Sequence, residues 1–285
     1  MNGAVNRGMP VRTTGLVHIY RADGHDVAAL SGVDLSVEAG DMVGLLGPSG
    51  SGKSTLLTLF GGLLRPSAGK IHVGEHELSA LPEPALDELR ARDIGLVLQG
   101  AARNLLPYLT PVQNVEFAQG AARRQGVSSL PSPAEVLELV GLHRHARRPL
   151  TALTPGHLQL LAVGVAVATL PGLLLADEPT SQLDHEARAT VLDTLARVNR
   201  EFGTTVVLVT HDPEVAAAMR RTVTIRDGRI GGEGRDGEEF AVVSADGALP
   251  LPPHVLDVLP PGTLVRVHLE DGTIQLLPQG QEDRS

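Results

Sequence analysis

The stretch GPSGSGKST at residues 47–55 constrains this chain more than any other feature of its sequence. It satisfies the pattern G-x-x-x-x-G-K-[ST], in which a glycine-rich loop turns backbone N–H groups around phosphate oxygens at the start of a helix. The flanking residues fit this setting, because 42–47 (MVGLLG) predict a buried strand and 53–64 (KSTLLTLFGGLL) predict the helix behind it. We therefore expect an α/β fold that binds the phosphates of a nucleotide at this loop.

The residues of this loop have separate expected roles. Lys53 is expected to neutralise the β- and γ-phosphates, Ser54 to bind Mg²⁺, and Thr55 to contact the α-phosphate side. The glycines allow the backbone to turn inward around the phosphates. The predicted nucleotide contacts in the loop are Gly47, Ser49, Gly50, Ser51, Gly52, Lys53, Ser54 and Thr55.

Polar side chains also follow two later apolar strands. Asp177 and Glu178 come directly after the run LLLA at 173–176, and His211 follows the apolar part of TTVVLVTHD. A carboxylate at a strand end can bind the hydration shell of Mg²⁺, so we assign Asp177 to the metal and Glu178 to polarising the attacking water. Two adjacent buried acids would be costly without such partners. His211 is more often a structural hydrogen-bonder in such a place, but beside a phosphate site we expect it to contact the γ-phosphate.

Together these segments resemble the ATPase subunit of an ATP-binding-cassette (ABC) transporter over roughly 15–230. The resemblance implies a P-loop NTPase fold with a core sheet, an antiparallel β subdomain and a helical subdomain at about 100–170, with ATP and Mg²⁺ as ligands. It also implies that Gln99 links Mg²⁺ and water to the helical subdomain, that Asp184 in SQLD reaches across a dimer interface, and that Tyr20 stacks on adenine. Tyr20 could equally be an ordinary core residue.

In that family each ATP lies between the phosphate loop of one subunit and an L-S-G-G-Q segment of the other. Here LTPGH at 153–157 takes that place, with Thr154 keeping a hydroxyl and Gly156 a backbone N–H for the γ-phosphate. Pro155 replaces a glycine and removes a donor. Leu160 and Val165 stand where the family usually has arginine. We expect this signature segment to be weakened.

The weakened segment leaves two quaternary arrangements open. One is tolerated drift in a working homodimer. The preferred one is an asymmetric heterodimer, in which this chain supplies Lys53, Asp177, Glu178 and His211 to a partner with an intact signature. The stretches NLLPYLTPVQNV (104–115) and LLRPSAGKIHVG (63–74) most resemble the subgroup for lipoprotein release, macrolide export and cell division, whose permeases are separate chains.

Function follows from this resemblance as an expectation. The chain is expected to be the motor subunit of a transport or mechanotransmission complex, held at the cytoplasmic face of the membrane by its permease. A soluble cassette ATPase acting on ribosomes or DNA is an alternative, and so is a regulatory subunit that binds ATP without hydrolysing it. The cleft for the permease is expected around 100–118.

Composition limits the other possibilities. The chain of 285 residues has no cysteine, so disulfides and thiolate metal sites are excluded. Residues 149–176 contain no charged residue and are long enough to suggest a membrane span, but Pro171-Gly172 divides them, which favours a buried helix followed by a strand. Residues 231–285 carry ten acidic and three basic residues, which accounts for −7 of the total charge of −9. A nucleic-acid partner is therefore disfavoured.

The ends of the chain predict three accessory segments. Residues 1–14 are expected to be a flexible N-terminus, 231–239 (GGEGRDGEE) a linker, and 240–280 a small β-rich extension. The extension weakly resembles the swapped-hairpin domains of AbrB-like transition-state regulators. A dimerisation or regulatory module and an inert appendage both remain open for it.

Overall fold

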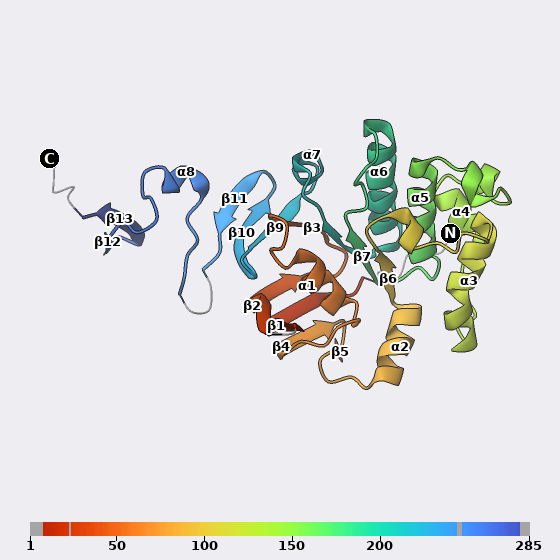
Figure 1. Ribbon diagram of the computed structural model, residues 1–285, viewed down its shortest axis with the longest axis horizontal. Coiled ribbons are helices and arrows are strands. Elements are labelled where there is room, and N and C mark those ends of the chain that lie inside the picture. Colours follow the sequence, from red (N-terminus) through yellow and green to blue (C-terminus); the bar gives the residue numbers. More distant parts are fainter. Residues whose placement is uncertain (1–7, 23, 244–246, 280–285) are drawn as a thin grey trace. The chain divides into compact units, whose positions relative to one another are not determined.

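The strands around the glycine-rich loop form one sheet in the computed structural model, which describes residues 8–22, 24–243 and 247–279. The strand order is β11-β10-β9-β3-β8-β7-β6, and β6, β7, β8, β3 and β9 run parallel (Figure 1). The bounds are β3 Met42–Leu46, β6 Ile94–Val97, β7 Leu173–Asp177, β8 Thr205–Val209, β9 Arg221–Arg226, β10 Arg229–Arg235 and β11 Glu238–Ala241. The α/β core predicted from the loop is confirmed.

Helices cover this sheet because its central strands are apolar on both faces, as parallel strands usually are. Leu173, Leu174 and Leu175 are fully buried, as are the corresponding residues of β8. Contacting helices are α1 (Lys53–Phe60), α5 (Pro155–Ala166) and α6 (His185–Phe202). The predicted helix after the loop is shorter than expected, since it ends at Phe60 before the Gly61-Gly62 pair.

The helical region lies at the β6 end of the sheet (Figure 1). It contains α3 (Pro111–Arg124), α4 (Pro133–Leu139) and α5, with the 3₁₀ turns η1 Ala101–Arg103, η2 His143–His145 and η3 Leu150–Ala152; α2 (Glu83–Arg92) precedes it. Each of α3, α4 and α5 begins with proline after a Thr or Ser cap, which is the favoured helix start. The uncharged stretch 149–176 divides into α5 and β7, as predicted, and no helix in the described part of the chain is long and apolar enough to cross a membrane.

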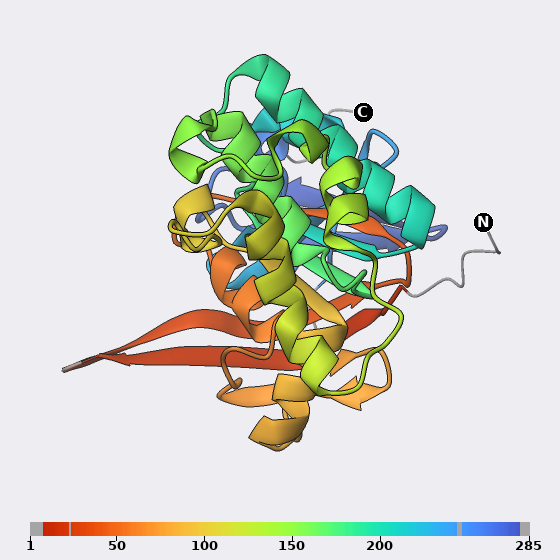
Figure 2. The ribbon, with the colours of Figure 1, turned by 90° about the vertical axis from the view of Figure 1, so that its right-hand side faces the viewer.

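A second, antiparallel sheet has the order β2-β1-β4-β5, and Figure 2 shows β1 and β2 as a long red hairpin. Its strands are β1 Val11–Ala22, β2 His25–Val37, β4 Ala68–Val73 and β5 His76–Glu77. The expectation that 1–14 is a flexible terminus is wrong for 11–14, because β1 begins at Val11, which is fully buried and pairs with Val37 and Val73. Residues 1–7 lie outside the described residues.

The expected linker at 231–239 is also wrong. Its first half belongs to β10, and β11 follows after a turn at Asp236-Gly237, where both residues have positive φ (48° and 89°). That is the backbone of a tight hairpin turn, and Asp-Gly signals it in the sequence. The glycines serve close packing rather than flexibility, because a Cβ on Gly234 would overlap the Thr222 hydroxyl.

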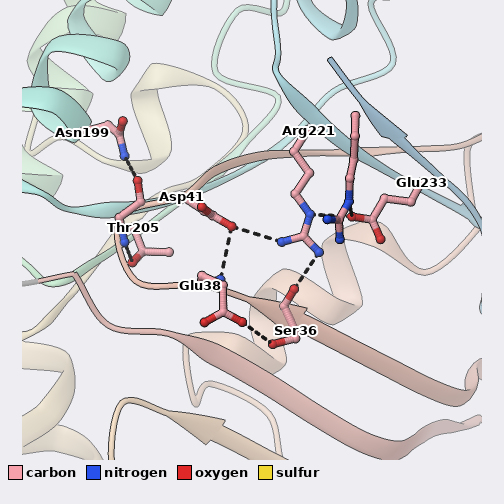
Figure 3. Close-up of polar contacts among 9 residues, drawn as sticks. Ser36, Glu38, Asp41, Asn199, Thr205, Arg221 and Glu233 are labelled. Atoms are coloured by element: carbon pink, nitrogen blue, oxygen red, sulfur yellow. Dashed lines mark hydrogen bonds and ion pairs between the residues drawn. The ribbon is translucent and has the colours of Figure 1, made fainter. Parts of the chain in front are cut away.

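An ion-pair network fixes this hairpin to the core (Figure 3). The Arg221 guanidinium donates to Glu233 at 2.7 Å, to Asp41 at 3.1 Å and to the Ser36 carbonyl at 2.7 Å. Arg235 donates to the same Glu233 carboxylate at 2.7 Å. These contacts hold the pKa of Glu233 below its usual value, although burial alone would raise it. The network joins β2, β9 and β10 to Asp41, which directly precedes β3, at the opposite end of that strand from the glycine-rich loop.

The chain divides into two compact units, Met1–Phe240 and Ala241–Ser285. The second unit contains α8 (Pro253–Leu256) and the hairpin β12 (Val265–Glu270) and β13 (Thr273–Pro278), whose turn at Asp271-Gly272 was predicted. The predicted strand EFAVV at 239–243 overlaps β11, which ends at Ala241. Because β11 lies beside β10, this strand belongs to the seven-stranded sheet. No contact in the described residues tests the resemblance to swapped-hairpin domains.

Candidate nucleotide-binding site

The glycine-rich loop connects β3 to α1 through backbone conformations that only glycine adopts easily. Gly47 and Gly52 have φ values of 142° and 102°. A Cβ at Gly47 would overlap the carbonyl oxygen of Ile225, and one at Gly52 would lie 2.5 Å from that of Ala29. Gly50 has φ of 77° with open space beside it. The loop is therefore fixed by neighbouring strands while its outer side stays open to a ligand.

Lys53 and Ser51 point their polar atoms into the loop. The Lys53 ammonium is buried and donates to the carbonyls of Gly47 and Pro48, both at 2.8 Å. It has a third proton for a further acceptor. The Ser51 hydroxyl is buried without a hydrogen-bond partner among the described residues. An unpaired buried hydroxyl is costly, and a phosphate oxygen in the loop would supply the missing acceptor.

Asp177 meets the loop from the end of β7. The Ser54 hydroxyl donates to its carboxylate at 3.1 Å, although 123 positions separate the two residues. Burial raises the pKa of Asp177, and the nearby Glu178 adds to this, while Ser54, Lys53 and Arg103 oppose it. A carboxylate and a hydroxyl side by side are oxygen ligands of the kind that Mg²⁺ takes, and a cation would favour the charged carboxylate. The residues fit the metal assigned to them.

Glu178 and His211 lie together at the ends of β7 and β8. The His211 Nδ1 and Glu178 Oε1 atoms are 2.6 Å apart, and a carboxylate can only accept, so Nδ1 carries the proton. Glu178 has a positive φ of 49°, a strained conformation for a residue with a side chain. Its N–H donates to the Val209 carbonyl, which holds it in place. The side chain of His211 is 69% exposed, whereas that of Glu178 is only 11% exposed. The pair therefore consists of a nearly buried carboxylate and a histidine ring that faces solvent.

Tyr20 reaches the loop from the antiparallel sheet. Its hydroxyl lies 3.2 Å from that of Thr55, and its ring stacks edge-on against His18 with centroids 4.7 Å apart. The ring is 43% exposed, which excludes the alternative that Tyr20 is a buried core residue. An exposed aromatic face beside the phosphate loop is suited to stacking on a base.

Gln99 follows β6 at the start of the helical region and is exposed. No described hydrogen bond reaches its side chain. The sequence interpretation missed Asn104, whose amide bonds to the backbone of Leu98 at 2.8 and 2.9 Å and to Gly100 at 3.0 Å. Asn104 therefore fixes the loop that carries Gln99. Asn and Asp are common loop-bracing residues, but nothing in the sequence singles this one out.

The signature segment forms the first turn of α5. The Thr154 hydroxyl caps the helix by accepting from the His157 N–H at 3.2 Å, and Pro155 takes the first helical position. The Leu158 N–H bonds to the Thr154 carbonyl at 3.0 Å. Among the described residues, the Gly156 N–H is therefore the backbone donor of this turn that is left for a ligand.

Packing of α5 accounts for two of the sequence departures, Leu160 and Val165, and for the small residue at Gly156. Gly156 packs on α6, since a Cβ there would lie 2.9 Å from that of Ala187. Leu160 is buried and Val165 partly buried in the apolar core, so hydrophobic contacts occupy both positions that were expected to hold arginine. Asp184 caps α6 by accepting from the Ala187 N–H at 2.8 Å. In the described residues no hydrogen bond or ion pair joins the segment to the glycine-rich loop of its own chain.

A second residue missed from the sequence is Arg188 on α6. Its guanidinium pairs with Asp212 at 2.8 Å and Glu214 at 2.9 Å. Asp212 follows His211 directly and caps α7 (Pro213–Ala217). Arg188 therefore connects the helix that starts at Asp184 to the loop that carries His211. Its position in the first turn of an ordinary helical pattern gives no sequence signal.

Comparison with known proteins decides the family. The sequence model described as ABC transporter matches residues 30–181. The chain belongs to the ABC transporter ATPase family. It is 41% identical over 225 residues to the lipoprotein-releasing system ATP-binding protein LolD of Anaeromyxobacter dehalogenans, which covers 79% of this chain and 93% of that protein. It is also 42% identical over 230 residues to the methionine import ATP-binding protein MetN of Caulobacter vibrioides, covering 80% and 68% respectively.

Other matches extend the comparison. The macrolide export ATP-binding/permease protein MacB of Rhodopirellula baltica is 37% identical over 225 residues, which is 77% of this ABC ATPase and 32% of MacB. Among solved structures, the dimeric post-hydrolysis state of the cassette MJ0796 bound to ADP and Pi has a TM-score of 0.70 at 32% identity, over 79% of this chain and 98% of that one. The predicted family, its LolD- and MacB-like subgroup and the cassette fold are confirmed.

These findings fix the general activity. This ABC ATPase binds and hydrolyses ATP, and cassettes of its family dimerise and work with membrane permease subunits. A membrane-associated location follows from the transport systems that its relatives serve.

Proposed function

We propose that this ABC ATPase is the hydrolytic half of an asymmetric pair of cassettes that drives a separate permease at the cytoplasmic face of the membrane. The proposal rests on one observation, which is that two surfaces of the chain differ in the polar groups they offer to a nucleotide. These are the loop surface around residues 47–55 and the signature surface at 153–157. On the loop surface Lys53 bonds to the loop carbonyls, Asp177 accepts a hydrogen bond from Ser54, and Glu178 bonds to His211. The signature surface retains one backbone donor in its first turn, at Gly156, and lacks both arginines.

The size of the deficit supports this assignment. One lost hydrogen bond to a charged phosphate costs about 1.5–3 kcal/mol, which is roughly tenfold or more in affinity. A homodimer would carry this deficit at both ATP sites. A heterodimer would confine it to the site that contains the partner's phosphate loop, so the site built on Lys53 and Glu178 would turn over normally.

The residues of the loop surface suggest how hydrolysis proceeds. Lys53 and the loop N–H groups hold the β- and γ-phosphates and stabilise charge that develops on them. The carboxylate of Glu178 orients and polarises the attacking water, and the Nδ1–H of His211 restrains that carboxylate through their 2.6 Å contact. Ser54 and Asp177 would hold a Mg²⁺ ion, with Gln99 as its expected link to the helical region, and the ion would supply positive charge that favours phosphoryl transfer.

The permease contact is proposed at residues 100–118. Tyr108 is 78% and Phe117 68% exposed there, which is unusual for large apolar side chains so close together in sequence. Both lie in the helical region that follows the loop carrying Gln99. By analogy with LolD and MacB, we propose a permease of the lipoprotein-release or macrolide-export type, without assigning its cargo.

The isolated chain tests the proposal. We expect the purified chain to bind ATP but to release phosphate slowly, with the Glu178→Gln chain remaining monomeric in ATP during size-exclusion chromatography. Turnover by the chain alone at the rate of an intact cassette, together with an ATP-dependent dimer of Glu178→Gln, would overturn the asymmetric pair in favour of the homodimer. Binding of MgATP, followed by fluorescence of a labelled nucleotide, controls for folding.

A further inference from the structure

The loop that follows β6 leaves the sheet directly beside Asp177. The last residue of β6 is the parallel register partner of Ala176, which precedes Asp177 on β7. The side-chain amide of Asn104 then accepts from the Leu98 N–H at 2.8 Å and donates to the Leu98 carbonyl at 2.9 Å, so the chain folds back onto its own start. Arg103, the residue before Asn104, is therefore held at the base of this loop, near the carboxyl end of β7.

The guanidinium of Arg103 is a positive charge without a close partner in the described part of the chain. Arg103 ends the turn η1 and is exposed, and no described residue forms a hydrogen bond or an ion pair with its side chain. Its charge nevertheless acts on Asp177, since burial raises the pKa of that carboxyl and Arg103 is among the groups that oppose the rise. Because such an effect weakens with distance, it agrees with the place of Arg103 beside the strand end.

The charges around the glycine-rich loop are poorly balanced for a polyphosphate. Lys53 contributes one ammonium group, whereas Asp177 and Glu178 contribute two carboxylates at the neighbouring strand end. ATP is an anion even when it carries Mg²⁺, so a further cation beside its γ-phosphate lowers the electrostatic free energy of binding. A guanidinium suits this place, because its planar fork of N–H groups matches two oxygens of one phosphate.

We propose that Arg103 binds the γ-phosphate of the ATP held by the glycine-rich loop of its own chain, and that it makes the site selective for a triphosphate over a diphosphate. The inference rests on the proposed function for the site around Lys53 and Asp177. ADP lacks the γ-phosphate, so the contact is lost when phosphate leaves. While the γ-phosphate is being transferred to water, Arg103 stabilises the charge on its oxygens.

Equilibrium binding to the purified full chain tests this contact. MgADP is compared with the magnesium salt of an ATP analogue whose β–γ bridge is an imido group that resists hydrolysis, each displacing a fluorescent nucleotide. Arg103→Gln should weaken binding of the triphosphate by about tenfold or more, and should change binding of ADP by less than about twofold. Arg103→Lys keeps the charge without the planar fork, so its loss should be intermediate.

A matched control comes from the same helical region. Arg144 is also an exposed arginine in a 3₁₀ turn, η2, and Arg144→Gln should leave both affinities unchanged. Thermal unfolding of Arg103→Gln should match that of the wild type, because the side chain is exposed and has no close partner among the described residues.

The permease offers a competing partner for Arg103, because residues 100–118 are also its proposed contact. If Arg103 serves an acidic group of the permease instead, the isolated Arg103→Gln chain will bind the triphosphate as tightly as the wild type, and the inference is overturned. Equal losses for the two nucleotides would overturn it as well, because they would assign the effect to the fold of the loop and not to the γ-phosphate.

The two proposals fail in different ways. An ATP-dependent homodimer of the Glu178→Gln chain would remove the asymmetric pair and leave the ratio of the two nucleotide affinities intact. An unchanged ratio in Arg103→Gln would remove the inference and leave the pairing of cassettes untouched.

Discussion

The loop surface at 47–55 and the signature turn at 153–157 bind opposite sides of a nucleotide in this family, yet they are built differently. The loop surface uses charged side chains from a helix and from the ends of two strands, and its polar atoms are buried or paired. The signature turn is a well-capped helix start, with Thr154 and Pro155 in favoured positions, and it retains few donors. A segment can therefore be well formed as a helix and poor as a phosphate site.

The requirements of a stable helix start and of phosphate binding conflict at one residue of the signature turn. Pro155 stabilises the start of α5, because proline fits the first helical position and its missing N–H has no intrahelical partner there. That N–H is also one of the donors that a phosphate would use at a helix N-terminus. The substitution is favourable for folding and unfavourable for binding, so changes on the two surfaces should have separable effects.

The largest effect is expected from the loop surface. Glu178→Gln should lower phosphate release by the assembled complex about 10²–10⁴-fold, because the amide cannot polarise water as the carboxylate does. Glu186→Gln, an exposed change in the first turn of α6, should leave the rate unchanged. If substantial turnover survives Glu178→Gln, the partner's site also hydrolyses ATP, and the two surfaces are less unequal than we propose.

A change that restores the signature turn should come next. Pro155→Gly returns one backbone donor to each copy, and the homodimer has two ATP sites. It should therefore strengthen ATP-dependent association of the Glu178→Gln chain with itself by about 1.5–3 kcal/mol per site, which is roughly a hundredfold or more in all. Analytical ultracentrifugation with MgATP measures the association. Unchanged association would show that the missing donor is not the cause of the weakness.

Packing beneath the signature turn is predicted to be as sensitive as its donors. Gly156→Ala places a methyl group 2.9 Å from the Cβ of Ala187 and should lower the free energy of unfolding by about 1–3 kcal/mol. Urea denaturation measures this. Ala187→Gly removes the opposing Cβ atom, so the double variant Gly156→Ala/Ala187→Gly should recover the unfolding free energy that the overlap costs. Glycine within a helix itself costs about 1 kcal/mol, so the recovery should fall short by that amount. No recovery would contradict the overlap as the cause.

A smaller effect is expected where the antiparallel sheet meets the loop. Tyr20→Phe removes the contact with the Thr55 hydroxyl and should weaken ATP binding by about 0.5–1.5 kcal/mol at most, whereas Tyr20→Ala should weaken it further by removing the ring. Equilibrium binding of a labelled ATP compares the two. Equal losses would assign the effect to the hydroxyl and not to base stacking.

The smallest expected effect is a pH dependence of stability at the signature turn. Because the pKa of His145 is lower in the folded chain, its contribution to stability is complete above about pH 6.5 and is lost as the pH falls through the folded value. The wild type should therefore lose stability between about pH 7 and 5 more steeply than His145→Phe. Thermal unfolding across this range compares them, and parallel curves would contradict the assignment.

Sequence patterns predicted the loop and the strands that follow it because local chemistry determines them. Asp177 and His211 follow apolar runs and Lys53 follows the glycine-rich loop after a third one, and parallel strands bring such ends to one side of a sheet. The linker at 231–239 was wrong because glycine indicates flexibility in composition, while Gly234 serves close strand packing against Thr222. The Asp-Gly pair at 236–237 was the available signal for the hairpin.

By itself the sequence determined the family and predicted the nucleotide loop and the catalytic residues, since each depends on residue type at short spacing. The tertiary structure alone decided which distant groups meet. Tyr20 with Thr55, Arg188 with Asp212, and His145 with His157 are paired by the packing of separate elements. Such contacts leave no local pattern, because their spacing along the chain is set by the path of the fold and not by the chemistry they perform.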